Sequence, residues 1–171
     1  MSRRERTRAL WISYGILFAV VFFLERCVCN RFPLFGAVPL AAPVVVALAG
    51  SLEGAWFGTA FGLAAGVLCA LVYQPVGAAM VWACTAMGLA CGLTVNRTMG
   101  RTFLGCLLCA LGGVVWIEAV QAVPRLLFLE QDPAAVGRIA GAEALYSALF
   151  APLLYPVVRA IHERFGLEPD Y

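Results

Sequence analysis

Six long stretches of this 171-residue chain are almost free of charge and rich in apolar side chains. About 20 consecutive apolar residues cross the hydrocarbon layer of a bilayer as a helix, and runs of this length are too long for the core elements of a soluble protein. Hydrophobic residues make up 63% of the chain and charged residues 13%, which leaves too little polar surface to cover a water-soluble globule. The sequence therefore predicts an integral membrane protein built of helices.

The gaps between charges predict an all-α, six-transmembrane-helix bundle in a single polytopic membrane domain, residues 1–171. The expected spans cover residues of about 9–24, 33–50, 54–73, 76–95, 102–123 and 139–159. Pro33, Pro39 and Pro43 interrupt the second span. The connections on both sides of the third span are very short, so the second, third and fourth spans should form a compact antiparallel meander.

Arginines set the expected orientation, because the chain contains no lysine. With an even number of spans both termini lie on one side of the membrane, and that side carries eight arginines against four on the other. Basic residues are enriched on the cytoplasmic side, so we expect both termini to be cytoplasmic. The segment LERCVCN after the first apolar run offers no small-residue cleavage site, so we expect the first span to be retained.

A row of glycines at every fourth position runs from the end of the second expected span through the third. Its members are Gly50, Gly54, Gly58, Gly62 and Gly66. Helices in lipid associate through close packing, and small residues spaced by four let two backbones approach each other. Gly88 and Gly92 in the fourth span offer a matching surface, as do Gly105, Gly112 and Gly113 in the fifth. Two interpretations remain open: packing inside the bundle, or a groove for a partner protein's helix.

Three polar residues are expected at membrane depth, and intramembrane ionisable groups are candidates for function. Glu118 lies in the fifth span, Gln121 shares its face, and Glu143 lies near the start of the sixth span. A buried carboxylate needs a partner, such as Arg125 or Arg138, or a protonated state. Glu143 could also lie in the first turn of its helix, where the helix dipole favours a carboxylate. The three residues form a candidate intramembrane polar cluster that opens outward.

Catalysis finds no support in the sequence, and we expect no enzyme. His162, the single histidine, is expected to be a surface residue of the cytoplasmic tail, and Glu53 to be solvated in a cytoplasmic turn. Cys106 and Cys109 form a CxxC within an apolar span, without a histidine or a second CxxC, which indicates packing rather than zinc or redox chemistry. We expect no catalytic, cofactor-binding or metal-binding residues, no cofactor, and no nucleic-acid partner.

Several segments in this order are similar to those of a known family. PLFGAVP leads into the second span, GTAFGLAAGVLCAL follows, and the C-terminal pattern is YSALFAPLLYPVVRAIHERF, with Pro152 seven residues before Arg159. The chain resembles the rod shape-determining protein MreD family, small membrane proteins of the bacterial inner membrane. It departs from the family at two places: Cys69 and Ala70 stand where many members have an aspartate, and Ser147 where an asparagine is common.

The resemblance implies a non-enzymatic, multi-pass component of the cell-wall elongation machinery in the bacterial cell membrane. The partners it implies are an MreC-like protein, a RodA-like glycan polymerase and a class B penicillin-binding transpeptidase, besides the lipid bilayer. It also implies an S-component-like fold, which opens an alternative: the substrate-binding S component of an energy-coupling factor vitamin transporter. Glu118, Gln121 and Glu143 would suit a vitamin pocket, but the second to fourth spans carry few hydrogen-bonding side chains for a tight small-molecule site.

Overall fold

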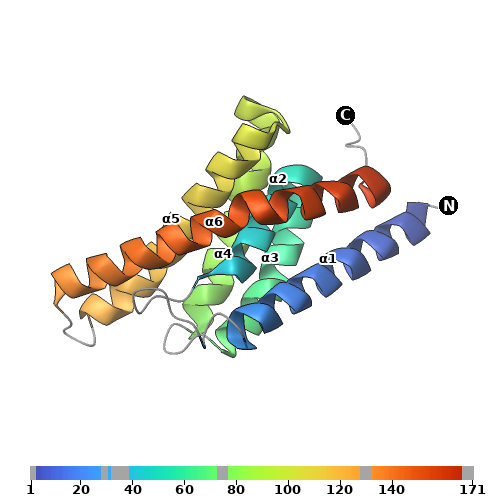
Figure 1. Ribbon diagram of the computed structural model, residues 1–171. Coiled ribbons are helices and arrows are strands. Elements are labelled where there is room, and N and C mark those ends of the chain that lie inside the picture. The colour runs from blue at the N-terminus through green and yellow to red at the C-terminus, as the bar shows by residue number, and fades with distance from the viewer. Residues whose placement is uncertain (1–2, 28–30, 32–38, 73–76, 128–131, 167–171) are drawn as a thin grey trace.

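The computed structural model describes residues 3–27, 31, 39–72, 77–127 and 132–166, and these residues form an all-helical structure without strands. The helices are α1 (Arg3–Cys27), α2 (Ala41–Glu53), α3 (Ala55–Ala70), α4 (Gly77–Thr94), α5 (Phe103–Leu127) and α6 (Pro133–Phe165). A π-helical turn over Val95–Met99 continues α4. In Figure 1, α1 and α6 lie in front of α2, α3 and α4.

Four of the described helices, α1, α4, α5 and α6, are long and apolar enough to cross a membrane. Helices α2 and α3 are apolar but have only 13 and 16 residues. At 1.5 Å per residue they measure about 20 and 24 Å, less than the roughly 30 Å of a bilayer's hydrocarbon core. The architecture is consistent with a helical membrane protein, while the number of crossings remains a prediction.

The helix bounds differ from the expected spans mainly at the first, the second and the sixth. Helix α1 begins at Arg3, six residues before the expected start at 9. Helix α2 begins at Ala41 rather than near residue 33, with Pro39 and Leu40 outside it, and residues 33–38 lie outside the described part of the chain. Pro43 therefore falls in the first turn, where backbone N–H groups have no intrahelical partner and a proline loses no bond. Helix α6 begins at Pro133, six residues before the expected start at 139, and Asp132 caps it by accepting a hydrogen bond from the Ala134 amide.

Helix α2 forms the centre of the bundle. Every residue from Ala41 to Leu52 is buried, and the helix contacts all five other α-helices. Its side chains are mostly alanine and valine, which are small enough to admit neighbours on every side. A helix that is apolar all round is expected to be fully enclosed, and the structure encloses α2 in protein.

The amino end of α2 is capped by side chains from other helices. Leu40, the residue before the helix, has no side chain that can cap it. Instead the Leu40 amide donates to Ser147 Oγ of α6 at 2.7 Å, and the Ala42 amide donates to Glu25 Oε2 of α1 at 2.9 Å. A carboxylate at this position also meets the positive end of the helix dipole. Helices α1 and α6 thus fix the start of α2.

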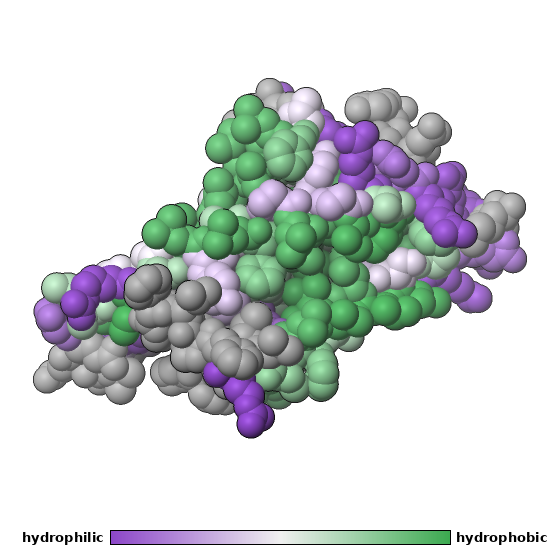
Figure 2. Space-filling view, viewed as in Figure 1, coloured by the Kyte–Doolittle hydropathy of each residue, from purple (hydrophilic) through white to green (hydrophobic). Residues whose placement is uncertain are grey.

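The first residues of α1 and the last residues of α6 lie at the same end of the molecule (Figure 1). Figure 2 shows polar side chains gathered at that end and an apolar surface over the middle of both helices. A common end for the two helices agrees with an even number of crossings; that this end is cytoplasmic remains a prediction.

Candidate functional site

The five glycines of the row are all buried where α2 and α3 meet α4. A Cβ on Gly62 would lie 2.5 Å from the carbonyl oxygen of Cys84, and a Cβ on Gly66 would lie 2.9 Å from the Cα of Val81. A Cβ on Gly58 would collide with the carbonyl oxygen of Gly88. Backbone atoms cannot move aside as flexible side chains can, so contact between α3 and α4 requires residues without a Cβ.

The row is divided between two helices, and it is not one continuous groove. Gly54 separates α2 from α3 with φ at 97°, a conformation that glycine adopts without steric cost. Gly50 on α2 and Gly58 on α3 then both face Gly88 of α4, while Gly92 packs against Gly54 and Ala55. This surface is occupied within the bundle, so packing inside the protein uses it.

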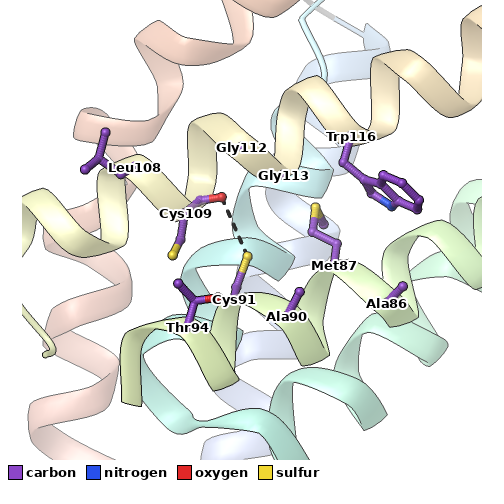
Figure 3. Close-up of a pocket in the computed structure, with 10 residues that line it drawn as sticks. All are labelled: Ala86, Met87, Ala90, Cys91, Thr94, Leu108, Cys109, Gly112, Gly113 and Trp116. Atoms are coloured by element: carbon purple, nitrogen blue, oxygen red, sulfur yellow. Dashed lines mark hydrogen bonds between the residues drawn. The ribbon is translucent and has the colours of Figure 1, made fainter. Parts of the chain in front are cut away.

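An open apolar groove of about 480 Å³ lies between α4 and α5. It is lined by Ala86, Met87, Ala90, Cys91, Thr94, Leu108, Cys109, Gly112, Gly113 and Trp116 (Figure 3). A Cβ on Gly112 would meet no atom within 4 Å, whereas one on Gly113 would lie 2.7 Å from Met87 Sδ. Gly112 therefore keeps a surface open, while Gly113 packs against Met87 inside the bundle.

Two hydrogen bonds hold the walls of the groove together. Trp116 Nε1 donates to the carbonyl oxygen of Ala83 at 3.1 Å, and Cys91 Sγ donates to the carbonyl oxygen of Cys109 at 3.6 Å, the bond drawn in Figure 3. All the described cysteines are free thiols. The part of the chain that the structure describes contains no group of three His, Cys, Asp or Glu side chains that could hold a metal. Cys109 accepts one of these two bonds through its backbone carbonyl oxygen, and it lines the groove.

The structure brings Glu118, Gln121 and Glu143 together with Arg125, and we call these four residues the Glu118 cluster. Arg125 Nη2 donates to Gln121 Oε1 at 3.3 Å, and Arg125 Nη1 lies 3.9 Å from Glu143 Oε2. Glu118 lies beside Glu143, with which it can share a hydrogen bond when one of the two carboxyls is protonated. Of the two arginines expected as partners for Glu118, Arg125 contacts Gln121 and Glu143 but donates no hydrogen bond to Glu118, and Arg138 is exposed.

Polar atoms in the Glu118 cluster lack partners. Glu118 and Gln121 are only 5% and 4% exposed, yet no described N–H or O–H group donates to either carboxylate oxygen of Glu118, and Gln121 Nε2 finds no described acceptor. Glu143 is ten residues into α6, and not in its first turn, so the helix-dipole explanation for this carboxylate is wrong. A buried polar group without a partner is costly in free energy, which marks the cluster as a candidate site.

A second cluster joins Tyr14 of α1, Glu53 of α2 and His162 of α6, and we call it the Glu53 cluster. The Tyr14 hydroxyl donates to Glu53 Oε1 at 3.0 Å, and His162 Nδ1 lies 2.9 Å from the same oxygen. The side chains of Glu53 and His162 are 1% and 20% exposed. The expectations of a solvated Glu53 and a surface His162 are therefore wrong, because α1 and α6 close over the end of α2.

One sequence feature pointed to the Glu53 cluster, although the assignment of spans had placed Glu53 in a solvated turn. Glu53 directly follows 21 residues without a charge, 32–52, in a connection too short to extend far from the bundle. A carboxylate in that position has to find donors close by. Tyr14 and His162 are 39 and 109 residues away from it along the chain, so only the fold identifies them as those donors.

Compared with known proteins, the chain matches no family model, no curated protein and no solved structure.

Proposed function

We propose that this protein is a non-enzymatic component of the bacterial cell-wall elongation machinery, located in the inner membrane and acting through helix–helix contacts with partner membrane proteins. The proposal rests on the likeness of its sequence pattern to the MreD family. One structural observation supports it most: the open groove between α4 and α5 is lined almost entirely by apolar and small side chains. Such a surface suits close contact with another apolar helix, since it has few groups that could orient a polar small molecule.

The partners we propose are an MreC-like protein, a RodA-like polymerase and a class B penicillin-binding transpeptidase. Of these, an MreC-like protein with a single membrane helix fits a groove between two helices most simply. In this arrangement Gly112 and Ala90 would let the partner's backbone approach, because small residues at a contact shorten the distance between helix axes.

The experiment is to fill the groove without disturbing the bundle. Gly112→Leu should leave the fold intact, because a Cβ at Gly112 meets no atom within 4 Å, but should abolish co-purification with the partner and make a rod-shaped host round. Gly15→Leu is the matched control, since Gly15 on α1 is equally open and away from the groove. Gly58→Leu should instead prevent folding altogether. Normal cell shape and normal co-purification in the Gly112→Leu strain would contradict the proposal.

A second candidate is the S component of an energy-coupling factor vitamin transporter, favoured by the unpartnered atoms of Glu118 and Gln121. A bound vitamin with matching polar groups would satisfy them. Mass spectrometry of the purified, denatured protein distinguishes the two functions. A stoichiometric vitamin, lost in Glu118→Ala, would support the transporter and overturn the scaffold, while its absence together with a co-purifying partner would do the reverse.

A further inference from the structure

One face of α1 combines arginines with apolar residues over its first three turns. Arg3, Arg4, Thr7, Arg8, Trp11 and Ile12 line an open hollow of about 740 Å³ on this face. These positions follow the spacing of three and four residues that places side chains on one side of a helix. Arg4 and Arg8 are exposed, and among the described residues neither takes part in an ion pair. The face therefore offers two cationic side chains that no described acidic group neutralises.

The hollow lies at the boundary between polar and apolar surface. Below the arginines, Ile12 and Ile16 are each 61% exposed, as expected of side chains that face lipid tails. Trp11 lies between the two zones, with its ring centroid 4.8 Å from that of Phe57, in the position that tryptophan favours at a membrane interface. At 1.5 Å per residue, Arg8 and Arg4 lie about 4.5 and 10 Å above Trp11, and the headgroup layer is about 5–8 Å thick.

We propose that this face binds the headgroup of an anionic phospholipid, with Arg4 and Arg8 on its phosphate and Trp11 and Ile12 against the start of its acyl chains. Arginine suits this role because its planar guanidinium donates two parallel hydrogen bonds to a phosphate. The Thr7 hydroxyl donates to the carbonyl oxygen of Arg3 at 2.9 Å, so the two arginines carry the recognition. The ligand is a lipid and not a free anion, since a free anion would leave the apolar half of the hollow unused.

The charge balance at this end of the molecule agrees with an anionic ligand. Among the described residues, six arginines lie in the first turns of α1 and the last turns of α6, against two exposed glutamates. One of these glutamates, Glu163, is paired with Arg159 at 2.7 Å. Figure 2 shows the resulting polar surface where the two helices meet. The inference is independent of the proposed function, since it concerns the bilayer and not a protein partner.

The test measures lipid preference in the full-length protein. The wild type and the double variant Arg4→Gln/Arg8→Gln are reconstituted in nanodiscs that contain phosphatidylglycerol and phosphatidylcholine, and the retained lipids are counted by native mass spectrometry. One basic residue near a membrane surface contributes about fivefold to anionic-lipid binding, so the double variant should lose a preference for phosphatidylglycerol on the order of 20-fold. The double variant Arg4→Lys/Arg8→Lys should keep part of the preference, because lysine retains the positive charge but lacks the planar guanidinium group of arginine.

The matched control is Arg6→Gln/Arg138→Gln, which removes the same charge elsewhere. Arg6 is exposed and turned about 160° from Arg8 around the helix, and Arg138 is exposed near the start of α6. This control should keep most of the preference, and thermal unfolding should show that all variants remain folded. An equal loss in the control would overturn the proposal in favour of a nonspecific charge effect. Displacement of the lipid by millimolar inorganic phosphate would overturn it in favour of a free-anion site.

Discussion

The Glu53 cluster and the Glu118 cluster both bury a carboxylate among apolar helices, but they differ in the hydrogen-bond donors that surround it. Glu53 Oε1 lies within hydrogen-bond distance of Tyr14 and His162, from two other helices, while Glu53 Oε2 has no partner among the described residues. Glu118 receives no hydrogen bond from a described N–H or O–H group and faces a second carboxyl, that of Glu143. The two sites have nearly the same burial, so the difference lies in the donors around them.

This difference distinguishes a cluster that stabilises helix packing from a candidate binding site. A buried carboxylate with converging donors stabilises the contact between the elements that supply them, because losing any member leaves the others unpaired. A buried carboxylate without donors costs free energy, and proteins retain such groups mainly where they serve a function. We therefore interpret the Glu53 cluster as holding α1, α2 and α6 together, and the Glu118 cluster as available for a ligand or a partner.

The largest effect is expected from Glu53→Leu. Tyr14 and His162 would then face an apolar side chain, and unpairing a buried polar network of this kind destabilises a protein by about 3–5 kcal/mol. Thermal unfolding of the purified variant in detergent measures the loss. Glu163→Leu is the control, because Glu163 is exposed and its pair with Arg159 is open to solvent, so no measurable change is expected. Equal melting temperatures for Glu53→Leu and wild type would contradict the interpretation that the Glu53 cluster stabilises helix packing.

A smaller loss is expected from Tyr14→Phe, which deletes one donor and keeps the ring. The ring still packs against Phe57, with centroids 5.2 Å apart, so the variant isolates the hydrogen bond to Glu53. A hydrogen bond to a charged group contributes about 1.5–3 kcal/mol, and the melting temperature should fall accordingly. Tyr146→Phe is the control, because the Tyr146 hydroxyl has no partner among the described residues. If both variants melt alike, the Tyr14 hydroxyl does not support the cluster.

Glu118→Gln should change stability by no more than about 1 kcal/mol, and in the stabilising direction, because it replaces an unpaired buried carboxyl with a neutral group of the same shape. Its effect should instead appear in function, as weaker partner co-purification or as loss of a bound small molecule. Melting temperature and co-purification measured on one preparation separate the two effects. A loss of stability as large as that of Glu53→Leu would indicate that Glu118, like Glu53, stabilises the packing of the helices.

The sequence predicted the helical, membrane-like character and most helix bounds, because long apolar runs and the charges between them are local signals. It predicted that Glu118, Gln121 and Glu143 lie near one another, since Gln121 follows Glu118 by less than one turn and the end of the fifth span and the start of the sixth were expected on the same side of the membrane. It gave no indication that Ser147 and Glu25 cap α2, because capping residues were expected next to the helix and not on other helices. Contacts between distant residues depend on how helices cross, and helix periodicity does not encode that.

The smallest expected effect is the coupling between Arg125 and Glu143, and it tests the comparison most directly. Their nearest charged atoms are 3.9 Å apart, near the upper limit for an ion pair, so the geometry of the pair is loose. A double-mutant cycle of Arg125→Gln and Glu143→Gln, followed by thermal unfolding, should give a coupling free energy of less than about 1 kcal/mol. The same cycle on Tyr14→Phe and Glu53→Gln should give a clearly larger value, because that hydrogen bond is short and buried. If the Arg125–Glu143 coupling equals or exceeds the Tyr14–Glu53 coupling, the Glu118 cluster also stabilises helix packing. The distinction between the two carboxylates would then no longer hold.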